Sequence, residues 1–265
     1  MTAVLLKHRK AVGTGFMALL SSLMLILFLI GKLEVGAWFM NTTRDAGFVL
    51  NDLKVEGQFR TSDNAILAQL DIEDGMPLFA INLGQIKDRL IALPWVKDAQ
   101  VVRKFPTGLE IKITEREPYG LWQHKGEVYI IDITGTVVKG QDVSNYAYLP
   151  WVVGDGAAAN ARALFDMLNL APELFANVKQ AVRVGDRRWD IIFNNGIRVK
   201  LPETALNPET EYGAEASWLR FAKIQNEHKL LSRELNVIDM RISDRVIMRI
   251  TPEGERAIEG KEWAA

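Results

Sequence analysis

The sequence predicts an α+β protein in which a single N-terminal membrane helix precedes two domains. Residues 11–31 hold no charged side chain, and 21 helical residues span about 30 Å, the thickness of the hydrocarbon core of a bilayer. Beyond residue 40 the chain has 225 residues, enough for two domains of about 100 residues each. Their helix and strand patterns group into one mixed segment and one strand-rich segment, as in α+β proteins.

The membrane helix is predicted to leave the N-terminus in the cytoplasm. Lys7, Arg9 and Lys10 precede the apolar run, and basic residues mark the cytoplasmic side of a membrane helix. The expectation is a single-pass type II protein, with most of the chain outside the cytoplasm. Its N-terminal parts are a cytoplasmic tail over residues 1–10, a transmembrane helix over 11–31 and a juxtamembrane linker over 32–47.

A cleaved signal peptide is the alternative interpretation of the apolar run. Residues 35–37 are small enough for a cleavage site. The run is longer than a signal core, however, and it ends well before that site. Trp38 and Phe39 also fit aromatic anchors at the outer interface of the membrane. A retained anchor is therefore preferred.

Composition excludes several classes of function for the exported part. Beyond residue 40 the chain has 28 Lys and Arg against 32 Asp and Glu, so no basic excess favours nucleic acid. Cysteine is absent, which excludes thiolate metal sites and cysteine nucleophiles. His8, His124 and His228 are the only histidines, and they show no metal-ligand spacing. His124 is expected in a surface turn between the two domains.

The segment after the linker is predicted to fold in the order strand, helix, helix, strand, strand. Apolar and polar residues alternate over residues 48–59, 96–104 and 109–115, which is typical of half-buried strands. Between the first and second strand, residues 61–64 are rich in helix-capping side chains, and Asn82 is placed to cap a second helix. These elements predict a small α+β layer domain.

The second segment is richer in strands. Helices are expected over about residues 158–170 and over 214–227, the latter with Trp218, Phe221 and Ile224 on one face. The tail after residue 251 is polar and is expected to fray. The predicted strands and hairpins cover residues 128–138, 149–154, 178–184, 189–193, 197–201, 237–241 and 245–250.

These segments resemble a known family. Four stretches of the first segment resemble the POTRA domain of the FtsQ/DivIB cell-division proteins: Val55-Glu56-Gly57, Leu93-Pro94-Trp95-Val96-Lys97, Arg103-Lys104-Phe105-Pro106 and residues 109–118. Residues 128–138 and 149–154 resemble the start of the family's second, β-rich domain. The resemblance implies a POTRA-like domain over residues 48–124, a β-domain over 125–251 and a C-terminal tail over 252–265.

The resemblance also implies a function. It implies a non-enzymatic scaffold of the bacterial inner membrane at the division septum, with most of the chain in the periplasm. The β-domain is expected to bind FtsB- and FtsL-type division proteins, and FtsK-, FtsW-, FtsI- and FtsN-type proteins are further expected partners. Such a scaffold links cytoplasmic ring assembly to septal peptidoglycan synthesis and needs no cofactor, metal or small-molecule substrate.

Partner-binding residues follow from the same resemblance. Asp239-Met240-Arg241 matches the family's Asp-Leu-Arg segment at the edge that faces FtsB. Glu115 matches a carboxylate implicated in divisome recruitment. Unpaired N–H and C=O groups at a sheet edge accept a partner segment. The predicted partner surface consists of Asp239, Met240, Arg241, Ile242, Ser243, Asp244, Val246, Met248, Ile250, Arg188 and Glu115.

Other classes of function are weighed against this one. A membrane-anchored periplasmic cell-envelope enzyme predicts a concave site with convergent titratable groups, and the sequence has no recognisable triad or metal set. An outer-membrane assembly factor needs a long series of alternating segments of about 10 residues, which is missing. Residues 154–159 fit G-x-G-x-x-A, the form of a dinucleotide loop, but a hairpin rather than a parallel βαβ series follows. Asp71, Glu73 and Asp74 are expected in a solvated turn.

Overall fold

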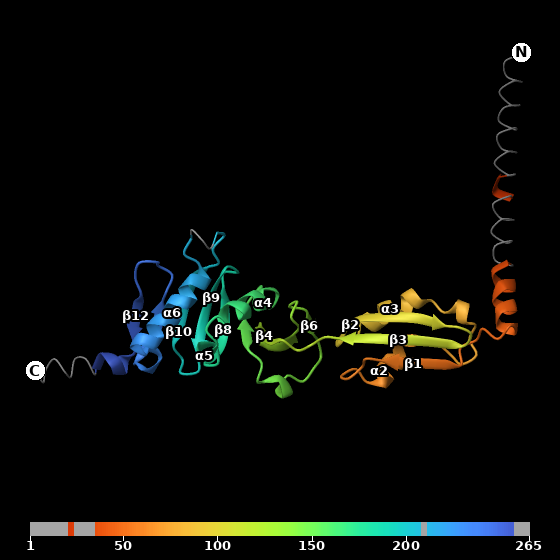
Figure 1. Cartoon of the computed structure of the whole chain (residues 1–265), viewed down its shortest axis with the longest axis horizontal. Helices are drawn as coiled ribbons and strands as arrows, with labels where there is room; N and C mark the ends of the chain where they lie inside the picture. The colour runs from red at the N-terminus through yellow and green to blue at the C-terminus, as the bar shows by residue number, and fades with distance from the viewer. Residues whose placement is uncertain (1–20, 24–34, 208–210, 257–265) are drawn as a thin grey trace, which may run out of the picture. The chain divides into compact units, whose positions relative to one another are not determined.

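The structure is a computed structural model that describes residues 21–23, 35–207 and 211–256. Among these residues no helix is both long and apolar enough to cross a membrane. The membrane helix predicted over residues 11–31 lies outside the described residues, except for residues 21–23, which are helical. The chain divides into two units, Met1–Glu115 and Arg116–Ala265 (Figure 1).

The first unit is built on a three-stranded sheet in the order β1-β3-β2. β1 (Asp52–Glu56) is parallel to β3 (Gly108–Glu115), and β3 is antiparallel to β2 (Val96–Lys104). The connection from β1 to β2 contains α2 (Asp63–Leu70), the short 3-10 helix η1 (Leu78–Ala80) and α3 (Leu83–Ile91), which lies along β2 in Figure 1. The predicted order of elements is confirmed.

Side-chain periodicity explains why these elements pack into one core. Alternate residues of β3, namely Leu109, Ile111 and Ile113, are buried, and so are the apolar residues on one face of α2 and of α3. Both helices begin at capping residues, since the side chains of Ser62 and Asn82 accept hydrogen bonds from the backbone N–H groups three residues on. The predicted caps are confirmed.

Residues 35–45, within the juxtamembrane linker predicted over residues 32–47, are helical. The helix ends in local hydrogen bonds: the Thr43 hydroxyl donates to the Met40 carbonyl, and the N–H groups of Gly47 and Phe48 donate to the carbonyls of Arg44 and Thr43. Gly47 has a φ of +86°, the left-handed conformation in which a glycine commonly ends a helix.

The second unit is built on a nine-stranded sheet in the order β12-β11-β10-β9-β8-β7-β4-β5-β6. Its strands are β4 (Gly120–His124), β5 (Glu127–Ile131), β6 (Val137–Val138), β7 (Trp151–Val153), β8 (Val178–Val184), β9 (Arg188–Phe193), β10 (Arg198–Glu203), β11 (Leu235–Asp239) and β12 (Ile247–Ile250). The β4–β7, β7–β8 and β10–β11 pairs are parallel, and the other pairs are antiparallel. The helices are α4 (Ala157–Leu168), α5 (Pro172–Phe175), α6 (Ala214–His228) and the short 3-10 helices η2 (Ser144–Tyr146) and η3 (Leu230–Ser232).

The core of this unit lies between the sheet and the two longer helices. Trp218 and Phe221 of α6 are fully buried, and Ile224 packs against the same core. The Trp218 ring stacks on that of Phe193 in β9, with the ring centroids 6.3 Å apart. The face that the sequence predicts for this helix is therefore confirmed.

The boundary between the units differs from the one that the sequence predicts. The sequence places it after His124, but β4 is an inner strand of the second sheet, antiparallel to β5 and parallel to β7. Its residues, Gly-Leu-Trp-Gln-His, do not alternate between apolar and polar side chains, so the pattern typical of a half-buried strand is absent. His124 is thus not in a turn between domains: its ring stacks on that of Trp122, and its Nε2 lies 2.7 Å from a carboxylate oxygen of Asp155.

An ion pair holds the start of the second unit in place. Arg116 donates to the buried carboxylate of Asp132 at 2.7 Å. Asp132 also accepts hydrogen bonds from the backbone N–H groups of Thr134 and Thr136, which forms the turn between β5 and β6. The Asp132 side chain is 3% exposed, so removal of Arg116 would leave a buried carboxylate without its counter-charge and would destabilise the unit. The second unit therefore needs Arg116 as well as β4.

The position of the cut between the units is the first prediction. A fragment of residues 116–265 is expected to unfold cooperatively. A fragment of residues 125–265 lacks Arg116 and β4, the strand that joins β5 and β6 to the rest of the sheet, and is expected to be less stable. Circular dichroism and thermal unfolding of the two fragments measure the difference. Residues 48–115 and 48–124 serve as controls and should have equal stability. Equal stability of the two longer fragments would contradict the boundary at Glu115.

Candidate partner-binding edge

β12 is the terminal strand of the nine-stranded sheet. It pairs with β11 along one side, and among the described residues no strand lies along its other side. The side chains of Ile247 and Met248 are 50% and 47% exposed, and Ile242 in the preceding loop is 43% exposed. An exposed apolar edge strand is an established template for pairing with another chain. The structure thus brings three apolar side chains to an open sheet edge.

Most predicted residues of this segment lie in the loop between β11 and β12. Arg241, Ile242, Ser243 and Asp244 are exposed there, whereas Val246 and Ile250 are half-buried. Ser243 precedes β12, so its backbone is not part of the edge strand. The sequence prediction of a strand over residues 245–250 is close, and the strand begins two residues later. The loop thus exposes side chains to solvent, and β12 exposes the backbone N–H and C=O groups of a sheet edge.

Met240 is a correction to the predicted surface. It directly follows β11, and its side chain is fully buried in the same core as that of Ile238. Its carbonyl accepts hydrogen bonds from the Tyr212 hydroxyl at 3.0 Å and from the Ser217 hydroxyl at 3.3 Å. The alternation Ile238, Met240 against Asp239, Arg241 was a visible signal, because residues two apart share a face of a strand. Met240 therefore anchors the start of the loop to the core.

Asp239 and Arg241 form a two-pronged ion pair within the chain. Arg241 Nη2 lies 2.6 Å from Oδ2 of Asp239, and Nε lies 2.8 Å from Oδ1. The Arg241 backbone N–H also donates to Oδ1, at 3.1 Å. The hydrogen bond from Arg241 lowers the pKa of Asp239 despite burial of the carboxylate, and the same bond raises the pKa of Arg241. The guanidinium expected to contact a partner is already engaged, and it closes the turn after β11.

The outer face of the sheet carries a row of charges that leads to this pair. Lys200 of β10 is in register with Asp190 of β9 on one side and with Asp239 of β11 on the other. Sequence reasoning missed Asp190 and Lys200, although both occupy the polar positions of alternating strands. Arg188 lies two residues before Asp190 and shares its face. The structure therefore joins Arg188 and Asp239 to one surface, across three strands.

Two buried polar atoms in this row lack hydrogen-bond partners in the described part of the chain. They are Nε of Arg188 and Oδ1 of Asp190. Asp190 is 4% exposed, and its other oxygen lies 3.3 Å from Nη1 of Arg198. A buried carboxylate oxygen without a donor costs free energy. The row is consequently only partly satisfied within the chain.

Glu115, which the resemblance adds to the predicted partner surface, lies in the first unit. Its side chain is 4% exposed. The carboxylate accepts hydrogen bonds from the backbone N–H groups of three consecutive residues, Phe59, Arg60 and Thr61, the shortest at 2.7 Å. It thereby folds the loop before α2 and leaves Phe59 88% exposed at the surface. The Glu115 carboxylate is therefore covered by the loop that it holds.

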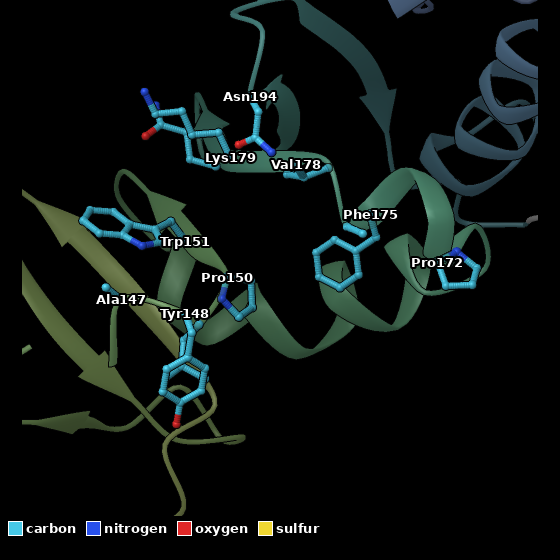
Figure 2. A pocket seen from close by; sticks show the side chains of 12 residues that line it. Ala147, Tyr148, Pro150, Trp151, Pro172, Phe175, Val178, Lys179 and Asn194 are labelled. Atoms are coloured by element: carbon cyan, nitrogen blue, oxygen red, sulfur yellow. The ribbon is translucent and has the colours of Figure 1, made fainter. Parts of the chain in front are cut away.

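A groove of about 630 Å³ lies elsewhere in the second unit (Figure 2). Its lining residues are Ala147, Tyr148, Leu149, Pro150, Trp151, Pro172, Phe175, Ala176, Val178, Lys179, Gln180 and Asn194. They include no carboxylate, so the convergent acidic pair that would favour an enzyme is not found in this groove. Among the described residues there is also no group of three His, Asp or Glu side chains suited to a metal ion.

Comparison with known proteins places the chain in a family. Residues 48–116 match the family model described as POTRA domain, FtsQ-type, and residues 120–241 match the one described as Cell division protein FtsQ/DivIB, C-terminal. The cell division protein FtsQ of Rhizobium meliloti is 35% identical over 218 residues, 82% of this chain and 68% of that protein. The chain belongs to the FtsQ/DivIB family.

Two further relatives have similar identity to this chain. FtsQ of Agrobacterium fabrum is 33% identical over 84% of this chain and 67% of its own length. FtsQ of Rhizobium radiobacter is 31% identical over 77% of this chain and 92% of its own length. The FtsQ/DivIB C-terminal match ends at residue 241. It includes the Asp239–Arg241 pair and stops before β12. Membership identifies a cell division protein, and β12 lies outside the matched range.

Glu115 gives a pH-dependent prediction. Burial raises the pKa of its carboxyl, but the backbone hydrogen bonds from Thr61, Phe59 and Arg60 outweigh burial, so the pKa lies below its ordinary value. The stabilisation is present above the ordinary carboxyl pKa and is lost as pH falls through the lowered value. Glu115→Gln should therefore destabilise the first unit by about 1–3 kcal/mol at pH 7, and the difference should shrink below about pH 4.

Urea unfolding of residues 48–115 at pH 7 and at successively lower pH measures this effect. Glu117→Gln, a neighbouring change beyond the loop contact, is a control in a fragment extended to residue 124. A constant difference between wild type and Glu115→Gln at every pH would show that the charge of Glu115 contributes nothing.

The Asp239–Arg241 pair gives a charge-reversal prediction. Arg241→Glu sets two carboxylates side by side and should lower the free energy of unfolding of the second unit by about 1 kcal/mol, since the guanidinium is partly exposed. The double variant Asp239→Arg, Arg241→Asp should recover most of that loss. Thermal unfolding measures both variants, with Arg245→Glu as a control in the same loop. If the double variant is no more stable than Arg241→Glu, the pair is not the stabilising contact.

Proposed function

We propose that this chain is a non-enzymatic, bitopic scaffold of the bacterial inner membrane that assembles the divisome in the periplasm. In this proposal the second unit binds FtsB- and FtsL-type partners, and other divisome members, of FtsK-, FtsW-, FtsI- or FtsN-type, join the assembly. The scaffold thereby links cytoplasmic ring assembly to septal peptidoglycan synthesis. Membership of a cell division family supports the role, and the charge-free run over residues 11–31 supports the membrane anchor.

The open edge at β12 is the observation that carries the binding proposal. A partner strand that pairs with β12 gains backbone hydrogen bonds, and its side chains meet Ile247 and Met248, which are half-exposed here. Burying such side chains contributes roughly 25 cal/mol per Å² of apolar surface removed from water. Backbone pairing and apolar burial together fit a partner that adds an extended segment to this sheet.

The charge row beside the edge supplies specificity in the same proposal. Asp190 has one carboxylate oxygen without a donor, and Arg188 has one N–H without an acceptor. Both atoms are buried, so in this proposal a partner meets the row through its partly exposed side chains, those of Arg188, Lys200 and Asp239. Charged contacts of this kind mainly set partner choice and the association rate. Anchoring scaffold and partners in one membrane would further raise their effective concentration.

Substitution in β12 tests the binding proposal. Ile247→Lys puts a charge on the open edge and should weaken binding of an FtsB-type periplasmic segment at least about tenfold, or about 1.4 kcal/mol. The matched control is Ile133→Lys, an equal change at an isoleucine that is 40% exposed in the turn before β6, the opposite end of the sheet. Calorimetric titration measures affinity, and unfolding curves verify the fold. Wild-type affinity in folded Ile247→Lys would refute the β12 edge as the binding site.

A further inference from the structure

Four phenylalanines gather at one end of the first unit, outside its buried core. They come from four segments: Phe39 from the helix over residues 35–45, Phe48 from the chain after it, Phe79 from η1 and Phe105 from the turn between β2 and β3. Phe79 lies at the centre of the cluster, with ring centroids 5.5 Å from Phe39, 5.9 Å from Phe48 and 5.6 Å from Phe105. None of the four belongs to the core of this unit.

Two rings of the cluster are exposed to solvent within the chain, whereas Phe48 and Phe79 are half-buried. Phe105 is 58% exposed, Phe39 is 44% exposed and the neighbouring Trp38 is 66% exposed. Aromatic side chains bury large apolar areas, so leaving several of them uncovered on one patch costs free energy. A contiguous exposed apolar patch of this kind marks an interaction surface with a protein or a membrane.

Backbone contacts fix the cluster rigidly to the unit. Phe48 and Leu78 are joined by a backbone hydrogen bond of 2.9 Å, and Val49 forms a β-bridge with Pro77. Arg103 holds η1 by donating to the carbonyls of Leu78 at 2.9 Å and Ile81 at 2.6 Å. The helix over residues 35–45 therefore does not hang from a free linker, because both its end and its Phe39 ring are attached to the unit.

The sequence before this helix identifies what covers the patch. Lys32 follows the charge-free run at once, and Phe39 is seven residues further on, about 10 Å as a helix and no more than about 25 Å if extended. The headgroup region on each side of the hydrocarbon core is several ångströms thick, and aromatic side chains concentrate there. Phe39 and Trp38 thus lie within reach of the lipid headgroups, and the contacts through Phe79 place Phe105 beside them.

We propose that this phenylalanine cluster is a membrane-contact surface, with which the first unit rests on the outer leaflet of the membrane that anchors the chain. The inference rests on the proposed anchor. It adds a fixed orientation: the turn at Phe105 faces the lipid, and the other end of β3 points away. Seven residue steps of β3 separate these ends by roughly 23 Å. The loop held by Glu115 therefore stands clear of the membrane.

Spin labels on the full chain in vesicles of phosphatidylethanolamine and phosphatidylglycerol test the orientation. The chain has no cysteine, so single-cysteine variants carry one label each. Phe105→Cys and Lys104→Cys place it at the proposed contact, the second variant keeping the Phe105 ring. Phe59→Cys is the matched control, an exposed phenylalanine beside Glu115 at the far end of β3. Collision with molecular oxygen reports lipid, and collision with a water-soluble nickel chelate reports water.

The expected result is a several-fold lower nickel accessibility at positions 104 and 105 than at position 59, with oxygen accessibility retained. Equal nickel accessibility at all three positions would overturn the proposal. Shielding from both reagents, with dipolar broadening between labels, would also overturn it and indicate a second copy of the chain. Release of the protein from the vesicles by alkaline carbonate would refute the membrane anchor and with it the proposed function. Retention of the protein with water-accessible labels at positions 104 and 105 would refute only this inference.

Discussion

Two-residue alternation across the nine-stranded sheet is the constraint on which the second unit depends. Successive side chains of a strand point to opposite faces, and α4 and α6 cover only one of them. Trp189, Ile191 and Phe193 of β9 point into that core, so Arg188 and Asp190 must lie on the outer face. The same alternation in β10 and β11 aligns Lys200 and Asp239 with Asp190. The charge row is a consequence of how the core is buried.

The edge at β12 follows from the same sheet. A sheet that does not close leaves two terminal strands, here β6 and β12. β6 has two residues, whereas β12 has four and carries half-exposed Ile247 and Met248. Very short edge strands resist unwanted pairing. The two ends of the sheet thus differ in a way that makes β12 the better template for a partner, and the Asp239–Arg241 pair fixes the turn that leads to it.

β3 organises the first unit in a comparable way. At one end, the turn before it carries Phe105 into the phenylalanine cluster. At its other end, Glu115 gathers three backbone N–H groups of the loop that exposes Phe59. One strand therefore determines the positions of two surfaces of different character. One is aromatic and is attached to the helix over residues 35–45, and the other is a loop that is held by hydrogen bonds and exposes a single ring.

The sequence by itself determined the α+β class, the order of elements in the first unit, the capping residues and the buried face of α6, because periodicity and caps are local properties of the chain. It also located the C-terminal hairpin and the family. Tertiary structure alone decided that β4 belongs to the second sheet, that the side chain of Glu115 is covered, that Arg241 is already paired, and that Asp190 and Lys200 join Asp239. Each of these depends on which distant segments become neighbours, and strand register between segments far apart in the chain leaves no local pattern in the sequence.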